Sequence, residues 1–143
     1  MLRRRTTTDK EAHFDCPVRG DLFGVAAEHV VYSEIVVPGV VFVEMAMESA
    51  RAHFGDGVQL RDIQMVWPLV VPKNGDSDEK QTWMRIAIIG NKRFELRSQT
   101  PGDDKWTTHC EGKIELNGPP AEQPPEFDMV RARCPEQVDS SKL

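Results

Sequence analysis

One stretch, residues 28–54, constrains the fold more than any other part of the chain. It reads EHVVYSEIVVPGVVFVEMAMESARAHF, and the pair Pro38-Gly39 divides it into a β-branched half and an almost entirely apolar half. Only two glutamates and a serine interrupt the apolar run as far as Ala50. A helix that is apolar on most sides is buried on most sides. The stretch therefore predicts a strand over residues 30–37 and then an enclosed helix that begins at Pro38.

The rest of the chain supplies strands to enclose such a helix. Apolar residues alternate or cluster, with turn residues between the runs, in these segments: a short edge strand over 13–18, a long strand over 58–71 with Pro68 at an edge or bulge position, and a meander over 82–89, 93–100 and 105–116. A helix and a curled sheet bury each other's apolar faces. The predicted fold class is α+β, a hot-dog fold with one long buried helix wrapped by a curled antiparallel sheet.

Composition divides the 143 residues into three parts. Residues 1–12 are polar and charged and predict a flexible lead-in. Residues 13–116 hold the hot-dog domain. Residues 117–143 open with four prolines in NGPPAEQPPE and predict a semi-rigid linker and tail.

Charge and cysteine usage exclude several classes of function. A net charge of −5 disfavours a nucleic-acid partner, which requires a basic surface. No apolar run reaches the roughly 18 residues of a membrane span. The three cysteines are widely spaced, which favours reduced thiols in the cytoplasm. The final Ser-Lys-Leu matches a peroxisomal address, which is the less favoured alternative.

Five segments together resemble the dehydratase domains of modular polyketide synthases. HVVYSEIVVP at 29–38 resembles the HxxxGxxxxP signature, and PGVVFVEMAMESA at 38–50 resembles the start of the central helix. WPLVVP at 67–72, WTTHCEG at 106–112 and FDMVRARCPEQVD at 127–139 resemble later segments in the same order. The resemblance implies the N-terminal hot dog of a double-hot-dog dehydratase, which eliminates water from a 3-hydroxyacyl-carrier-protein thioester to give a 2-enoyl thioester.

That reaction assigns roles to the residues of the first motif. His29 matches the family's catalytic base, and the ordinary pKa of histidine, about 6.5, suits proton abstraction near neutral pH. Ser33 stands where the family has glycine, at a strand position close to the substrate. The helix start at Pro38, Gly39 and Val40 offers free backbone N–H groups to the thioester oxygen.

The acid that protonates the leaving hydroxyl is less clear from the sequence. Single-hot-dog fatty-acid dehydratases use a glutamate six residues after the helix-opening proline, and Glu44 stands at that offset from Pro38. Double-hot-dog enzymes take an aspartate from a DxxxQ/H motif in the other half, and Asp128 is followed four residues on by Ala132, which does not match. The acid therefore comes from a second hot-dog half or from a second copy of the chain.

The remaining expectations concern partners and rival functions. The substrate would arrive on the phosphopantetheine arm of an acyl carrier protein, and no cofactor or metal is needed. His109 is expected to be structural, and the tryptophans are expected in the sheet core. Two rivals remain: a catalytically silent thioester-binding or scaffolding hot dog, and a cyclase-like product-template half-domain.

Overall fold

The computed structural model describes residues 4–8, 10–18, 24, 26–71, 82–90, 92–116, 129 and 132–133. Its helix and strands follow the chain in the order β1 (Arg4–Thr7), β2 (Glu11–Pro17), β3 (Val30–Val31), β4 (Glu34–Val36), α2 (Gly39–Phe54), β5 (Val58–Met65), β6 (Val70–Val71), β7 (Trp83–Ile89), β8 (Arg93–Gln99) and β9 (Thr107–Leu116). The segments 72–81 and most of 117–143, where a turn and the Pro-rich linker are predicted, lie outside the described residues and stay predictions.

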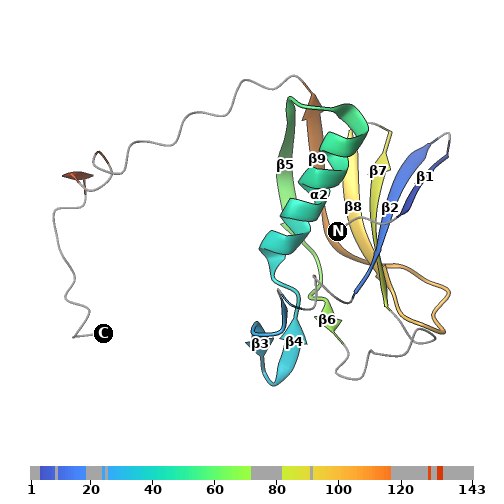
Figure 1. The fold of residues 1–143 in the computed structure, drawn as a ribbon, viewed down its shortest axis with the longest axis vertical. Helices are drawn as coiled ribbons and strands as arrows, with labels where there is room; N and C mark the ends of the chain where they lie inside the picture. The colour runs from blue at the N-terminus through green and yellow to red at the C-terminus, as the bar shows by residue number, and fades with distance from the viewer. Residues whose placement is uncertain are drawn as a thin grey trace.

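A six-stranded antiparallel sheet forms one layer, and helix α2 lies across one of its faces (Figure 1). The strand order is β1-β2-β7-β8-β9-β5. Inward residues alternate along β7 and β8 because successive side chains of a strand point to opposite faces. They meet the buried side of α2 in a core whose largest fully buried side chains include Phe94, Met45, Met84, Ile86, Ile88 and Leu96. The predicted α+β hot-dog arrangement, one helix against a curled antiparallel sheet, is confirmed.

A second, three-stranded sheet in the order β3-β4-β6 lies at the end of the domain where α2 begins (Figure 1). The prediction of one strand over 30–37 is wrong here, because the chain reverses at Tyr32 and Ser33 to form the β3–β4 hairpin. Both turn residues have positive φ angles, of 48° and 67°. Such turns usually contain Asn or Gly, so a Tyr-Ser turn carries no sequence signal.

The segment predicted as a long strand over 58–71 is also divided. Strand β5 pairs with β9, with a bulge between Arg61 and Gln64 where Asp62 has a φ of 51°. After Met65 the chain leaves this ladder, passes Pro68, and rejoins as β6 in the small sheet. Proline cannot donate a ladder hydrogen bond, which fits a break at this position.

The helix is less enclosed than its composition predicts. Six of its residues are buried, namely Val41, Phe42, Met45, Ala46, Ser49 and Ala50. The opposite side is open: Val40 is 75% exposed, and Glu44 and Glu48 are exposed too. The first turn of the helix thus presents an apolar side chain to solvent.

Two further expectations differ from the structure at the N-terminal side and in the aromatic residues. Residues 4–7, within the predicted lead-in, form β1, and β2 lies between β1 and β7 rather than at an edge.

The tryptophans do not build the core: Trp67 and Trp83 are 65% and 40% exposed. Trp106 is half-buried, and the Arg85 guanidinium lies 4.3 Å from the centre of its ring. In the described part of the chain, no helix is long and apolar enough to cross a membrane.

Candidate functional site

His29 is held at the base of the β3–β4 hairpin by three hydrogen bonds. Its backbone N–H donates to the carbonyl of Ala26 at 2.9 Å, and its own carbonyl accepts from the N–H of Val36 at 3.1 Å. In the third, its side-chain Nδ1 lies 2.7 Å from the carbonyl oxygen of Val36. A carbonyl can only accept, so Nδ1 carries the proton and Nε2 keeps a free lone pair. The ring is exposed.

The start of helix α2 follows this hairpin directly. Pro38, the predicted first residue of the helix, is instead the N-cap, one position before the helix begins at Gly39, and it makes no side-chain cap hydrogen bond. The N–H of Val41 bonds back to the Pro38 carbonyl at 3.0 Å, whereas the N–H groups of Gly39 and Val40 have no intrahelical acceptor. The first turn contains no acidic residue. The positive end of the helix dipole is thus available to an oxygen atom that carries partial negative charge.

Gly39 allows a close approach at this point. A Cβ atom built on Gly39 would lie 3.3 Å from Cε of Met65, at the end of β5. A side chain here would therefore press against the end of the Met65 side chain, and glycine leaves that space open between the helix start and the strand end. Four of the predicted site residues, His29, Pro38, Gly39 and Val40, gather in this region between the hairpin and α2.

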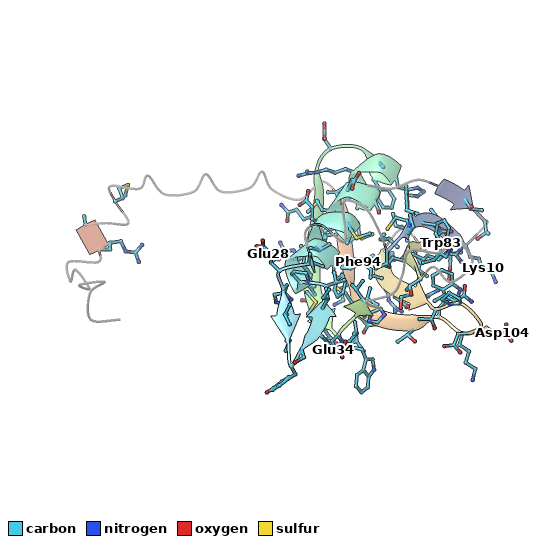
Figure 2. The ribbon with its side chains drawn as sticks, turned by 60° about the horizontal axis from the view of Figure 1, so that its bottom comes forward. Lys10, Glu28, Glu34, Trp83, Phe94 and Asp104 are labelled. Carbon is cyan, nitrogen blue, oxygen red and sulfur yellow. The ribbon has the colours of Figure 1, made fainter. Side chains whose placement is uncertain are left out.

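Ser33 lies in the hairpin turn rather than in a strand. Its φ of 67° is in the left-handed region, which glycine adopts without steric cost. This gives a physical reason for glycine at the corresponding position of the HxxxGxxxxP signature. Figure 2 shows Glu28 and Glu34, the residues directly before and after the segment 29–33, on the opposite side of the molecule from Trp83, Lys10 and Asp104.

Glu44 is exposed on the second turn of α2, on the same side as Val40. In the described residues its carboxylate has no hydrogen-bond or ion-pair partner. The structure therefore does not bring Glu44 and His29 together through a contact within one chain. A carboxylate in this position is accessible from solvent.

Large apolar side chains are exposed around the same region. Tyr32 at the hairpin tip is 98% exposed, Val30 56%, Met65 53% and Val70 43%. They come from the hairpin, β6 and the end of β5, and Val40 of the helix start adds to them. Exposed apolar side chains from neighbouring elements are a feature of interaction surfaces.

His109 is buried, as its expected structural role requires. It is 4% exposed, and burial lowers the pKa of its imidazole, although the carbonyls of Trp67 and Pro68 act in the opposite direction. Its Nε2 lies 2.7 Å from Oγ of Ser98. Sequence reasoning did not identify Ser98, because only the fold shows which residue of β8 faces the histidine.

An open pocket of about 470 Å³ lies elsewhere, at the β5 bulge, and contains none of the predicted site residues. It is lined by Asp62, Ile63, Gln64, Arg93, Glu111, Gly112 and Lys113. Across the described residues no three His, Cys, Asp or Glu side chains are grouped so that they could hold a metal ion.

Comparison with known proteins assigns the chain to a family. Residues 1–99 match the sequence model of the family described as polyketide synthase dehydratase domain. The chain belongs to the polyketide synthase dehydratase family. It is 31% identical over 121 residues to the highly reducing polyketide synthase AN6791 of Emericella nidulans, covering 74% of this chain and 5% of the relative. It is 36% identical over 104 residues to a highly reducing polyketide synthase of Aspergillus terreus, covering 61% and 4%.

Solved dehydratase structures have the same fold. The dehydratase domain from the CurK module of curacin polyketide synthase superposes with a TM-score of 0.78 at 20% identity, covering 99% of this chain and 50% of that one. GphF dehydratase 1 gives a TM-score of 0.70 at 26% identity, with coverages of 92% and 52%. The chain thus corresponds to one half of a dehydratase domain and to a small part of the full synthases.

Proposed function

We propose that this chain is the half of a polyketide synthase dehydratase that carries the catalytic base, and that His29 is that base. The observation that supports it most directly is the hydrogen bond from Nδ1 of His29 to the Val36 carbonyl. It fixes the tautomer with an accepting Nε2 on an exposed face, as proton abstraction requires.

In the proposed reaction Nε2 of His29 removes the proton from the carbon next to the thioester carbonyl. Negative charge then develops on the thioester oxygen. The free N–H groups of Gly39 and Val40, with the helix dipole behind them, would stabilise that charge. A protonated acid gives its proton to the leaving hydroxyl, and a 2-enoyl thioester remains.

The acid would come from a second hot-dog half. The similar CurK structures include an inactive histidine-to-phenylalanine mutant and an inactive aspartate-to-asparagine mutant. In that protein the substituted aspartate lies farther beyond the substituted histidine than this chain is long. The exposed apolar side chains of the hairpin, the β5 end and the helix start would bury against this half. The substrate would be presented on phosphopantetheine by an acyl carrier protein.

The test combines this chain with the C-terminal dehydratase half of a relative such as AN6791 and a 3-hydroxyacyl-carrier-protein. We expect water elimination by the complex, and a loss of about 10²–10⁴-fold in kcat for His29→Ala, the usual contribution of a general base. His13→Ala is the matched control, because that ring bonds Glu11 on β2 and lies outside the hairpin region. No turnover by a confirmed complex, or equal losses in the two variants, would contradict the proposal.

Glu44 distinguishes the two sources of acid. If the second half supplies it, Glu44→Gln leaves kcat of the complex within about twofold of the parent. If instead the chain works as a pair of identical copies, the chain alone dehydrates the substrate and Glu44→Gln abolishes that turnover. We favour the first outcome, because CurK loses activity when an aspartate is substituted.

A further inference from the structure

A buried hydrogen-bond relay crosses the domain from the main sheet to the segment that follows β5. Oγ of Ser98 on β8 lies 2.7 Å from Nε2 of His109 on β9, and Nδ1 of His109 lies 3.0 Å from the carbonyl oxygen of Trp67. Ser98 is 5% exposed and His109 4%. Buried side-chain networks of this kind are strong only when every member is satisfied.

The chemistry of the partners decides which atom donates the proton in each hydrogen bond of the relay. The Trp67 carbonyl can only accept, so Nδ1 of His109 carries the proton and donates it. Nε2 is then the acceptor for the hydroxyl proton of Ser98. Burial lowers the pKa of His109, which keeps the ring neutral and preserves this arrangement. The carbonyl of His109 also accepts from the N–H of Val66 at 2.8 Å, so the residue holds the segment at two adjacent points.

The segment held by His109 in turn supports the hairpin of His29. Two residues after Trp67, the carbonyl of Leu69 accepts a hydrogen bond from the N–H of Val37 at 2.9 Å. The next residues form β6, which pairs with β4 through Ile35–Val71 and Val36–Val70. Val36 provides the carbonyl that receives Nδ1 of His29. A continuous series of bonds therefore joins the two imidazoles.

From this series we infer that His109, fixed by Ser98, is a positioning residue that sets the orientation of the His29 ring through segment 66–71 and β4. His109 fastens the small sheet β3-β4-β6 to the large sheet at the point where β5 ends. The catalytic value of that orientation rests on the proposed function, but the orientation itself is measurable without any reaction.

The experiment compares Ser98→Ala with Ser49→Ala in the full chain by NMR. Ser49 is a matched control, because this residue is also buried, at 0% exposed, and among the described residues its hydroxyl donates to the Met45 carbonyl of its own helix at 2.8 Å. Two readouts are followed: the ¹⁵N shifts of the His29 ring, which report its tautomer, and the exchange rate of the Val37 amide. The amide of Ile86 in the middle of the large sheet reports global opening.

We expect Ser98→Ala to speed exchange at Val37 by about tenfold relative to Ile86, the effect of one lost buried hydrogen bond. The His29 ring should then show a mixture of tautomers. Ser49→Ala should leave the ratio of the two amides and the His29 shifts unchanged. Ser98→Thr keeps a hydroxyl and should restore the parent values, which a purely volumetric effect would not do.

His109→Asn extends the test, because its amide can still donate to the Trp67 carbonyl. It should perturb Val37 less than His109→Leu, and if the leucine variant does not fold, the Ser98 series decides alone. Equal acceleration of Val37 and Ile86 in Ser98→Ala, or unchanged His29 shifts, would overturn the inference. If the shifts move as expected but the parent complex shows no dehydration, the positioning role stands and the proposed function fails.

Discussion

Ser33 occupies a backbone conformation that costs a non-glycine residue energy. Its φ of 67° follows Tyr32 at 48°, so two consecutive residues with side chains are left-handed. Each costs roughly 1–2 kcal/mol relative to the ordinary conformation. Because the turn is tight, His29 lies opposite Val36, and the strained turn thereby brings the His29 ring to the Val36 carbonyl.

Replacing Ser33 by glycine should therefore stabilise the hairpin. The gain, after the larger backbone entropy that glycine loses on folding, is about 0.5 kcal/mol. Glu34→Gly, one residue later in a regular strand position, should instead destabilise it by about 0.5–1 kcal/mol. Amide exchange at Val36, which bonds the His29 carbonyl, measures both. Opposite signs are expected, and two destabilisations would contradict the strain argument.

Gly112 illustrates a different constraint at the scale of one residue. A Cβ atom there would lie 2.6 Å from Cε1 of Phe94 and 3.1 Å from the Arg61 carbonyl oxygen. Phe94 is 0% exposed and pairs directly with Gly112 across the β8–β9 ladder. The glycine of the WTTHCEG segment is thus needed because an aromatic ring covers the backbone at that point.

Gly112→Ala should destabilise the domain by about 1–3 kcal/mol, the usual range for overpacking a core. Replacing the aromatic ring by leucine in the double variant Gly112→Ala/Phe94→Leu should recover part of that loss, although Phe94→Leu alone is destabilising. Urea denaturation of the parent, the two single variants and the double variant gives the coupling. Simple additivity of the two losses would show that the ring is not what excludes a side chain here.

The lowered pKa of His109 makes folding stability depend on pH. The unfolded chain binds a proton at this residue near pH 6.5, whereas the folded chain does so only at lower pH. The unfolded state therefore holds more protons just below pH 6.5, and stability falls as pH falls through that region. Glu11, whose pKa is lowered chiefly by its hydrogen bond to His13, adds a loss only at pH values near and below its ordinary pKa of 4.5.

We expect the free energy of unfolding of the parent to decrease between pH 7 and pH 5.5, and His109→Asn to show a smaller decrease. Denaturation curves at several pH values in this window provide the measurement. His13→Asn, on β2, serves as the comparison because it removes a histidine of the large sheet away from the relay. A slope that His109→Asn does not change would assign the pH dependence to other groups.

At the scale of elements, the end of β5 is an edge of the large sheet that carries exposed apolar side chains. β5 is a terminal strand of the order β1-β2-β7-β8-β9-β5, and an unpaired edge is a template for another chain. The bulge at Asp62 interrupts its middle, and Asp62 bonds Nζ of Lys113 at 2.6 Å. The part of this edge that remains suited to association is therefore the apolar end around Met65.

Met65→Lys should weaken binding of a second dehydratase half by about tenfold or more, since a charge would then be buried in an apolar contact. Leu116→Lys is the matched control: Leu116 is 45% exposed at the far end of β9, beside the start of β5. Sedimentation or calorimetric titration of the two variants against the same half compares them. Equal weakening would place the interface elsewhere.

At the scale of the whole molecule, hydrophobic periodicity predicts those elements whose buried faces are covered by other residues of the same chain. The helix after Pro38 and the strands of the β7–β9 meander agree with the sequence reading within a few residues, because their core partners are local or adjacent in the sheet. The hairpin of Tyr32 and Ser33 could not be predicted, since neither residue favours a left-handed turn. The polar strand β1 has the composition of a loop and is recognised only by its pairing with β2.

The candidate site, too, can be predicted from the sequence only in part. The resemblance to the HxxxGxxxxP signature identifies His29, but not the Val36 carbonyl that fixes its tautomer or the relay through His109. Those contacts depend on which strands meet, and spacing along the chain does not reveal them. The expected enclosure of α2 fails on one side, where Val40 and Glu44 are exposed, and the proposed second half would cover that side.

The two edge strands of the large sheet differ in the charge and polarity of their residues. β1 has the sequence RRTT, and charged residues on an edge strand discourage pairing with another chain. The β5 edge ends in exposed apolar residues. Association through the sheet edges is therefore directional: the end of β5 around Met65 permits it, whereas the charges on β1 discourage it. An assembly built from such units would stop after one junction instead of extending into a fibre.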